Sequence, residues 1–299
     1  MLLSVSFLSY FLLYLGAGDV ARRILGLNAT DADVEALNEQ LGLNRPLLDQ
    51  FFTWLSGAVR LDLGQAWSMP ERVSEALFPR LEITLILVSL TTIVAAVVAV
   101  AIGTLAALRG GWIDRVVQLF SLIGFAVPGF LIAFYLAIFF AIQIPLFNAV
   151  GYTPFSADPW EWARSVTLPV AALAFSAVAA AAQQTRSAVK DALGMDYVRT
   201  LRARGLSFSR VVYKHILRNI AGPILAILGV QFVGMLGGAI LVEQIFAIPG
   251  LGPYAVSATS LGDIPAVMGL VVVTALIVIV MNLLVELISA ALNPKVRLS

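Results

Sequence analysis

The sequence predicts an all-α integral membrane protein with six transmembrane helices, and three observations support this prediction. The chain of 299 residues is 60% hydrophobic and only 12% charged, whereas soluble domains carry about 25% charged residues. Several long stretches contain almost no charge, and each can supply the roughly 20 apolar residues that cross a bilayer. Basic residues gather in short segments between these stretches, which is typical of the cytoplasmic loops of membrane proteins.

The first predicted transmembrane helix covers residues 1–17, of which only Leu2 to Leu15 are apolar. These residues would make a helix of roughly 21 Å, which is shorter than a hydrocarbon core of about 30 Å. No basic residue precedes the stretch, so it does not match a secretory signal peptide. We interpret it as the far end of a truncated first span, and a short interfacial helix is the alternative.

Residues 18–81 are predicted to form an external helical segment after this first span. Residues 31–43 have the periodicity of a short amphipathic helix. One face of that helix would carry its aliphatic residues Val34, Leu37 and Leu41. A turn at residues 44–46 precedes a second predicted helix at residues 46–59. We therefore expect a small folded cap rather than a flexible linker.

Residues 82–292 are predicted to form the membrane core, followed by a tail at residues 293–299. The five core spans are expected near residues 83–108, 116–142, 165–185, 219–242 and 264–285, the last continuing towards Leu292. Pro128 and Pro223 are expected to bend their helices. Small residues are dense in several spans, and they allow helices to approach closely in lipid.

The distribution of basic residues predicts how these spans are oriented. Loop 109–115, segment 186–218 and the tail together contain twelve Lys and Arg residues, whereas the facing loops 143–164 and 243–263 contain only Arg164. Because short basic loops stay in the cytoplasm, both termini are expected there. We therefore predict a multi-pass protein of the bacterial inner membrane.

Several kinds of chemistry are absent from the sequence. The chain has no cysteine and a single histidine, His215, which excludes disulfides, thiol nucleophiles and multi-histidine metal sites. It contains no phosphate-binding GxxxxGK[ST] motif and no GxSxG motif. An intramembrane enzyme would need a carboxylate pair, a Ser/Lys dyad or a His cluster within the spans. We therefore predict no catalytic residue, no bound metal and no nucleic-acid partner.

Segment 186–218 has the composition of a docking element. It contains eight of the nineteen Lys and Arg residues. Residues 191–204 are predicted to form one helix continuing from the span above, Gly205 to end or bend it, and Ser207 or Ser209 to cap the next helix. Its apolar residues are Tyr197, Val198, Leu201 and Leu206. An apolar patch in a cationic frame favours a binding surface; the alternative is that the arginines only set topology and meet anionic lipids.

Four stretches carry a resemblance to a known family. They are DYVRTLRARGLSFSRVVYKHILRNIAGPIL in the basic segment, LGLNRPLLDQFFTWLSGAVRLDLGQAW after the first span, GGAILVEQIFAIPGLGPYAVSATSLGDIPAVMG in the outer loop and AALNPKVR near the C-terminal end. Together they resemble ABC importer permeases of the dipeptide/oligopeptide/nickel class. Leu61 and Leu201 stand where that family has Gly and Ala, which leaves the substrate subfamily open.

The resemblance implies a type I ABC importer permease fold and a subunit that forms half of a path for peptides or a related small solute. A nickel-chelate permease of the same class is one alternative. An ion-gradient-driven transporter or channel is another, but such proteins often carry buried ionisable relays, and this chain has almost no buried charge.

The resemblance also implies partners and coupling residues. The expected partners are a homologous but not identical second permease, two cytoplasmic ATPase subunits, an external solute-binding protein and membrane lipid. ATP and Mg would be bound by the ATPase subunits, with no cofactor in this chain. The residues expected to couple to the ATPase are Asp196, Tyr197, Arg199, Thr200, Ala203, Gly205 and Leu206.

Two further groups of residues are candidates for the transport path. Gln231 and Met235, one turn apart in a glycine-rich span, are predicted to line a pore, although an interhelical hydrogen bond is an equal alternative for Gln231. The outer segment is predicted to dip partly into the protein. Its candidate external-gate residues are Glu243, Pro249, Gly250 and Asp263. Two solvated loop acids are the alternative for Glu243 and Asp263.

Overall fold

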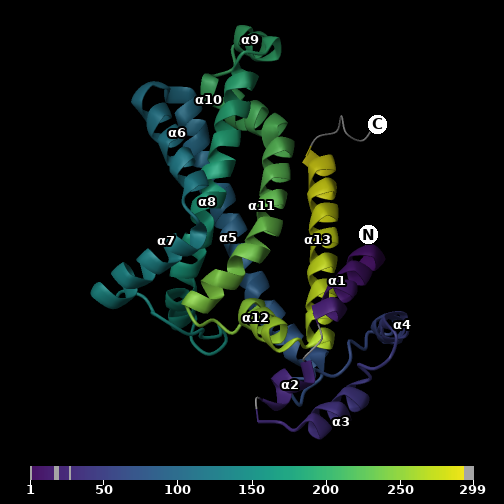
Figure 1. Cartoon of the computed structure of the whole chain (residues 1–299). Helices are drawn as coiled ribbons and strands as arrows, with labels where there is room; N and C mark the ends of the chain where they lie inside the picture. The colour runs from purple at the N-terminus through teal and green to yellow at the C-terminus, as the bar shows by residue number, and fades with distance from the viewer. Residues whose placement is uncertain (1, 17–19, 27, 293–299) are drawn as a thin grey trace. The chain divides into compact units, whose positions relative to one another are not determined.

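The computed structural model describes residues 2–16, 20–26 and 28–292 of the chain (Figure 1). Within these ranges the structure is helical, and its β pairing is limited to a single bridge between Gln65 and Arg72. The predicted all-α class is therefore confirmed. The chain divides into two compact units, one containing the chain up to Thr84 together with Pro249–Ile279, and the other containing Leu85–Ile248 together with the chain from Val280 onward.

The first unit contains the predicted external segment and residues 249–263 of the predicted outer loop. Its complete helices are α1 (Leu2–Gly16), α2 (Val20–Leu25), α3 (Asp31–Leu41), α4 (Leu47–Ala58) and α12 (Leu251–Leu261). It also holds residues 73–84 of α5 (Val73–Arg109) and residues 264–279 of α13 (Ile264–Leu292). Leu63, Val73, Tyr254 and Leu270 belong to its buried core, so the segment after the first span packs against α12 and α13.

The second unit contains the membrane core. Its complete elements are α6 (Gly111–Ala126), α7 (Gly129–Leu136), the π-helix η1 (Ala137–Gln143), α8 (Pro159–Leu193), α9 (Asp196–Ala203), α10 (Phe208–Arg210), the π-helix η2 (Val211–Ile216) and α11 (Leu217–Ile245). The remainder of α5 and α13 completes it. Helix α8 is its central helix. In the most apolar 18-residue stretch of α8, 78% of the residues are buried, whereas in the corresponding stretch of α5 only 28% are buried.

Four helices in the described chain are long and apolar enough to cross a membrane: α5, α8, the continuous helix Phe208–Ile245 and α13. Helix α6 and the stretch formed by α7 and η1 meet at a bend of 99°, and the two together count as a fifth candidate only if such a bent pair is one span. Pro128 stands at this break as predicted, because its ring cannot continue the helix. Pro223 lies inside α11, and the bend predicted there stays a prediction. The predicted first span corresponds to α1, whose 15 residues are fewer than a crossing requires.

The two helices predicted in the external segment are present, and their ends have local causes. Thr30 caps α3 by accepting a hydrogen bond from the Asp33 amide, while the Asp33 carboxylate accepts one from the Thr30 amide. Gly42 ends α3 with a left-handed backbone, φ 70°. Pro46 precedes α4, where its missing amide proton is not needed.

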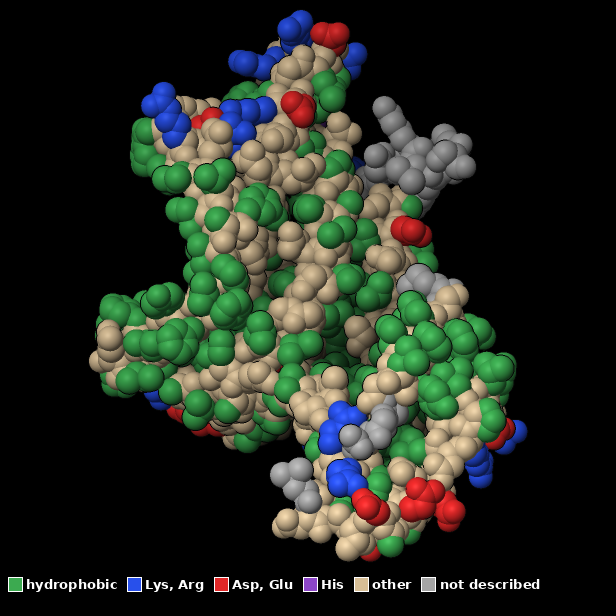
Figure 2. All heavy atoms as spheres, viewed as in Figure 1, with side chains coloured by type: hydrophobic (Ala, Val, Ile, Leu, Met, Phe, Trp, Pro, Cys, Tyr) green, Lys and Arg blue, Asp and Glu red, His purple; other side chains and the backbone are tan. Residues whose placement is uncertain are grey.

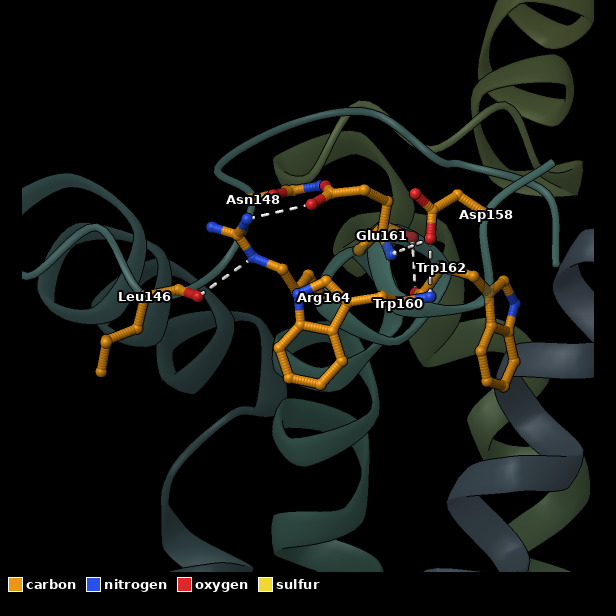
Figure 3. A network of polar contacts seen from close by, with 8 residues as sticks. Leu146, Asn148, Asp158, Trp160, Glu161, Trp162 and Arg164 are labelled. Carbon is orange, nitrogen blue, oxygen red and sulfur yellow. Dashed lines mark hydrogen bonds and ion pairs between the residues drawn. The ribbon is translucent and has the colours of Figure 1, made fainter.

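Polar contacts tie the start of α8 to the loop that precedes it. At the start of α8, the Asp158 carboxylate accepts hydrogen bonds from the amides of Trp160 and Glu161 (Figure 3). Arg164 donates to the Leu146 carbonyl and pairs with Glu161 at 3.0 Å. These contacts hold the preceding loop against α8, and Glu161 neutralises Arg164, the only Lys or Arg of the facing loops 143–164 and 243–263.

Candidate functional site

Helix α9 lies beyond the end of α8, in the segment predicted to dock a partner (Figure 1). The prediction of one helix over residues 191–204 was wrong, because α8 ends at Leu193 and α9 begins at Asp196. Met195 takes an extended backbone, φ −77° and ψ 147°, and so breaks the helix between them. Gly194 was the sequence signal for this break. The break makes α9 a separate short helix rather than the end of a long one.

Gly205 forms the predicted turn after α9. Its φ is +85°, a left-handed conformation that costs other residues roughly 1–2 kcal/mol. Its amide donates to the Arg202 carbonyl at 2.9 Å, and the Leu206 amide donates to the Leu201 carbonyl at 3.3 Å. Ser207 then occupies the N-cap position of α10, although its side chain makes no capping bond.

The predicted coupling residues divide between two sides of α9. Asp196, Arg199, Thr200 and Ala203 are exposed, whereas Tyr197 and Leu206 are half-buried. Asp196 and Arg199 pair at 3.4 Å with side chains that are 94% and 78% exposed, so this pair contributes little stability.

The inner side of α9 anchors the helix. Val198 is buried, and α9 contacts η2, whose Val211, Val212 and Ile216 are fully buried. The exposed side of α9 is therefore presented from a packed base. Figure 2 shows basic side chains gathered around it.

An ion-pair cluster lies at the same end of the second unit. Lys190 of α8 donates to the Asp114 carboxylate at 2.8 Å, and Arg186 pairs with the same carboxylate. The side chains of Asp114 and Arg186 are only 13% exposed. The cluster joins the first turn of α6 to the last turns of α8, so the two predicted basic loops share one end of this unit. The sequence signal was a lone acid inside loop 109–115.

A cavity of about 270 Å³ lies between α7, α8 and α11. Its lining is Gly129, Phe130, Leu173, Ser176, Gln231, Gly234, Met235, Gly238, Leu241 and Val242. Gln231 and Met235 therefore line the same cavity, while their role in transport stays a prediction. The cavity is mainly apolar, with one amide and one hydroxyl side chain and no charged residue on its wall.

The acids predicted at an external gate are both fully buried. The alternative of two solvated loop acids is therefore wrong. Asp263 precedes α13 and accepts hydrogen bonds from the amide and hydroxyl of Ser68, at 2.8 and 2.7 Å, and from the Ala266 amide at 3.1 Å. Its carboxylate thus caps α13 and ties the external segment to it.

The other gate residues lie around the end of α11 and the start of α12. Glu243 lies in the last turn of α11, where its carbonyl accepts a hydrogen bond from the Ile248 amide at 2.8 Å. Pro249 is exposed, and Gly250 caps α12 with an extended backbone. The Leu251 amide donates to the Thr84 hydroxyl at 2.9 Å. Residues 251–261 of the outer segment therefore form a helix rather than an open loop.

Tyr254 of α12 packs beside a cation in the first unit. The Arg80 guanidinium lies 5.0 Å from its ring centre, a distance at which a cation is attracted to the ring face. Burial, and then the nearby Asp263 carboxylate, raise the pKa of the Tyr254 hydroxyl to about 12.

Comparison with known proteins gives two family matches. The family described as binding-protein-dependent transport system inner membrane component matches residues 99–298, and the family of its N-terminal part matches residues 1–88. A protein of Brucella abortus named as a peptide transport system permease is 34% identical over 297 residues, which cover 99% of this chain and 95% of that protein.

Two further relatives match over nearly their whole length. A protein of Sinorhizobium fredii named as a peptide ABC transporter permease is 37% identical over 289 residues. These residues cover 96% of this chain and 92% of that protein. The glutathione transport system permease of Shigella flexneri is 34% identical, with coverage of 98% and 94%. A solved structure of the MetNI methionine ABC transporter in inward-facing conformations has a TM-score of 0.59 at 16% identity, covering 75% of this chain and 100% of that chain. This last likeness bears on the fold alone.

Proposed function

We propose, because this chain belongs to the family of binding-protein-dependent transport system inner membrane components, that it forms half of the translocation path of an ATP-driven importer for peptides. The observation that carries the substrate class is the match over more than 90% of both chains to relatives named for peptides or glutathione. Family membership decides against an autonomous ion-gradient-driven transporter or channel. It gives no support to the nickel-chelate alternative over peptides.

The cavity between α7, α8 and α11 is the proposed part of the path in this chain. Peptides carry amide donors and acceptors, and the Gln231 side chain offers both kinds of group. Three glycines of the wall, Gly129, Gly234 and Gly238, leave room for a ligand close to the backbone. A neutral wall suits solutes whose charges differ, because it neither attracts nor repels one net charge.

Helix α9 is the proposed contact with a cytoplasmic ATPase. It presents Arg199, Thr200 and Ala203 from a packed base, and the ion-pair cluster of Asp114 braces the end of α8 that leads into it. Movement of α9 would therefore be passed to α8, the central helix of its unit. ATP and Mg would be bound by two ATPase subunits, with a homologous second permease and an external binding protein completing the importer in the bacterial inner membrane, both termini of this chain facing the cytoplasm.

Filling the cavity is expected to block transport. In an importer reconstituted with its partner subunits, Gly234→Trp should reduce ATP-dependent uptake of labelled di- and oligopeptides at least about tenfold, because the indole would occupy the proposed path. Gly222→Trp is the matched control on the same helix: neither glycine has a neighbouring atom within 4 Å of an added Cβ, and Gly222 does not line the cavity.

Two results would contradict the proposal. Uptake by Gly234→Trp equal to that of Gly222→Trp would place the path elsewhere. Uptake of a nickel chelate but of no peptide by the unmodified importer would show that the substrate class is wrong while leaving the path open.

A further inference from the structure

Helix α4 carries an apolar stripe that the protein itself does not cover. Phe51 points into the core and is 2% exposed. On a second side, Leu48, Phe52 and, just after the helix, Val59 are 55%, 60% and 78% exposed. On a third side lie the exposed polar residues Asp49, Thr53, Ser56 and Arg60.

The spacing of these residues makes each set a continuous stripe. Leu48, Phe52 and Val59 are separated by four and seven positions, which keeps them on one helix face. The polar stripe runs beside it. Its hydroxyls are satisfied within the helix, since Thr53 donates to the Asp49 carbonyl and Ser56 to the Thr53 carbonyl, each at 2.8 Å. The Phe51 side already packs against the protein. If the rest of α4 faced water, a second apolar stripe would have nothing to pack against.

Contacts with α1 show which part of that apolar helix α4 packs against. The Phe51 ring packs edge-on against Phe7 and Tyr10, with ring centres 5.2 and 5.6 Å apart. Phe7 and Tyr10 precede the end of α1 at Gly16 by nine and six residues, which is roughly 9–14 Å at 1.5 Å per residue. Helix α4 therefore lies alongside α1 and not beyond its end.

Contacts with α13 independently place α4 beside an apolar helix. Phe51 and Tyr10 share a buried cluster with Ile264 and Met268, in the first turns of a helix that is apolar and long enough to cross the membrane. Trp54 and Trp67 pack against this cluster, and tryptophan is enriched at membrane interfaces. Helix α4 thus packs against the first turns of a candidate membrane span.

We propose that α4 is an interfacial helix whose stripe of Leu48, Phe52 and Val59 inserts among the acyl chains of the outer lipid leaflet. Its polar stripe then faces the head groups and water, which is the arrangement of helices that lie in the membrane plane. The ring of Phe52 lies 5.6 Å from that of Phe51, which in turn contacts Phe7. The stripe therefore continues the exposed apolar surface of α1, and Figure 2 shows hydrophobic side chains gathered over α1 and α4.

Single-cysteine labelling tests this proposal directly, because the chain has no native cysteine. Phe52→Cys and Ser56→Cys would each be labelled with the fluorophore nitrobenzoxadiazole in the reconstituted importer. The Phe52 label is expected to be quenched several-fold more strongly by lipids with nitroxide on the acyl chain than the Ser56 label. The Ser56 label is expected to be quenched several-fold more strongly by aqueous iodide. Leu48→Cys should behave like Phe52→Cys.

Two outcomes would overturn the proposal. Strong iodide quenching of the Phe52 label, equal to that of the Ser56 label, would mean that the stripe lies in water. Protection of the Phe52 label only after the external binding protein is added would mean that the stripe is a protein-docking surface. Neither readout depends on the substrate or on uptake, so failure here would leave the proposed function unaffected.

Discussion

Replacing Gly205 with proline is expected to reduce ATP-driven uptake about tenfold or more. Proline fixes φ near −65°, whereas Gly205 has φ +85° and its amide donates to the Arg202 carbonyl. The variant would lose this turn and redirect α9 relative to η2. Uptake by the reconstituted importer measures the effect.

Gly205→Asn is the matched control, because asparagine tolerates the left-handed region. It should retain most of the uptake. An added Cβ at Gly205 meets no atom within 4 Å, so its cost is the backbone strain of the left-handed turn and not a clash with a neighbouring helix. Normal uptake by Gly205→Pro would show that the geometry of α9 does not matter for coupling.

Gly124→Ala is expected to destabilise the membrane core. Its new Cβ would lie 2.3 Å from the Ala179 Cβ, at a site where α6 and α8 are held together by a hydrogen bond from Ser121 to the Ala179 carbonyl. Overpacking of this kind costs about 1–3 kcal/mol. Thermal unfolding of the purified protein in detergent measures it.

Gly237→Ala separates packing from helix propensity, since Gly237 also lies within a helix and has no neighbour within 4 Å of an added Cβ. Both changes gain the propensity of alanine, about 1 kcal/mol, so the difference between them is the packing cost. The double variant Gly124→Ala/Ala179→Gly should recover much of the loss. Equal stability of Gly124→Ala and Gly237→Ala would contradict the close approach of α6 and α8.

The sequence predicted the features that the chain determines locally. Charge-free runs indicate spans because lipid excludes charge, and Gly205 indicates a turn because few other residues adopt its backbone. The local sequence does not predict helix α12, because Pro253 and the glycines in and around it are loop signals. Pro253 falls in the first turn, where a proline removes no helical hydrogen bond.

Contacts between distant residues could not be predicted in the same way. Asp263 and Ser68 are separated by 195 positions, and Asp114 and Arg186 by 72. Nothing in the local pattern of Asp263 distinguishes a buried helix cap from an exposed acid. Gly194 did indicate a break, but its effect depended on the extended backbone of Met195.

Cysteine cross-linking between α9 and the ATPase tests the central claim most directly. Ala203→Cys, on the exposed side of α9, would be compared with Ala157→Cys, an exposed position at the opposite end of the second unit, in a chain that otherwise has no cysteine. With a short bifunctional maleimide, Ala203→Cys is expected to cross-link to an ATPase subunit carrying a single surface cysteine, and Ala157→Cys is not. Absence of any Ala203 cross-link in an assembled, transport-active complex, across a set of such ATPase positions, would contradict the account.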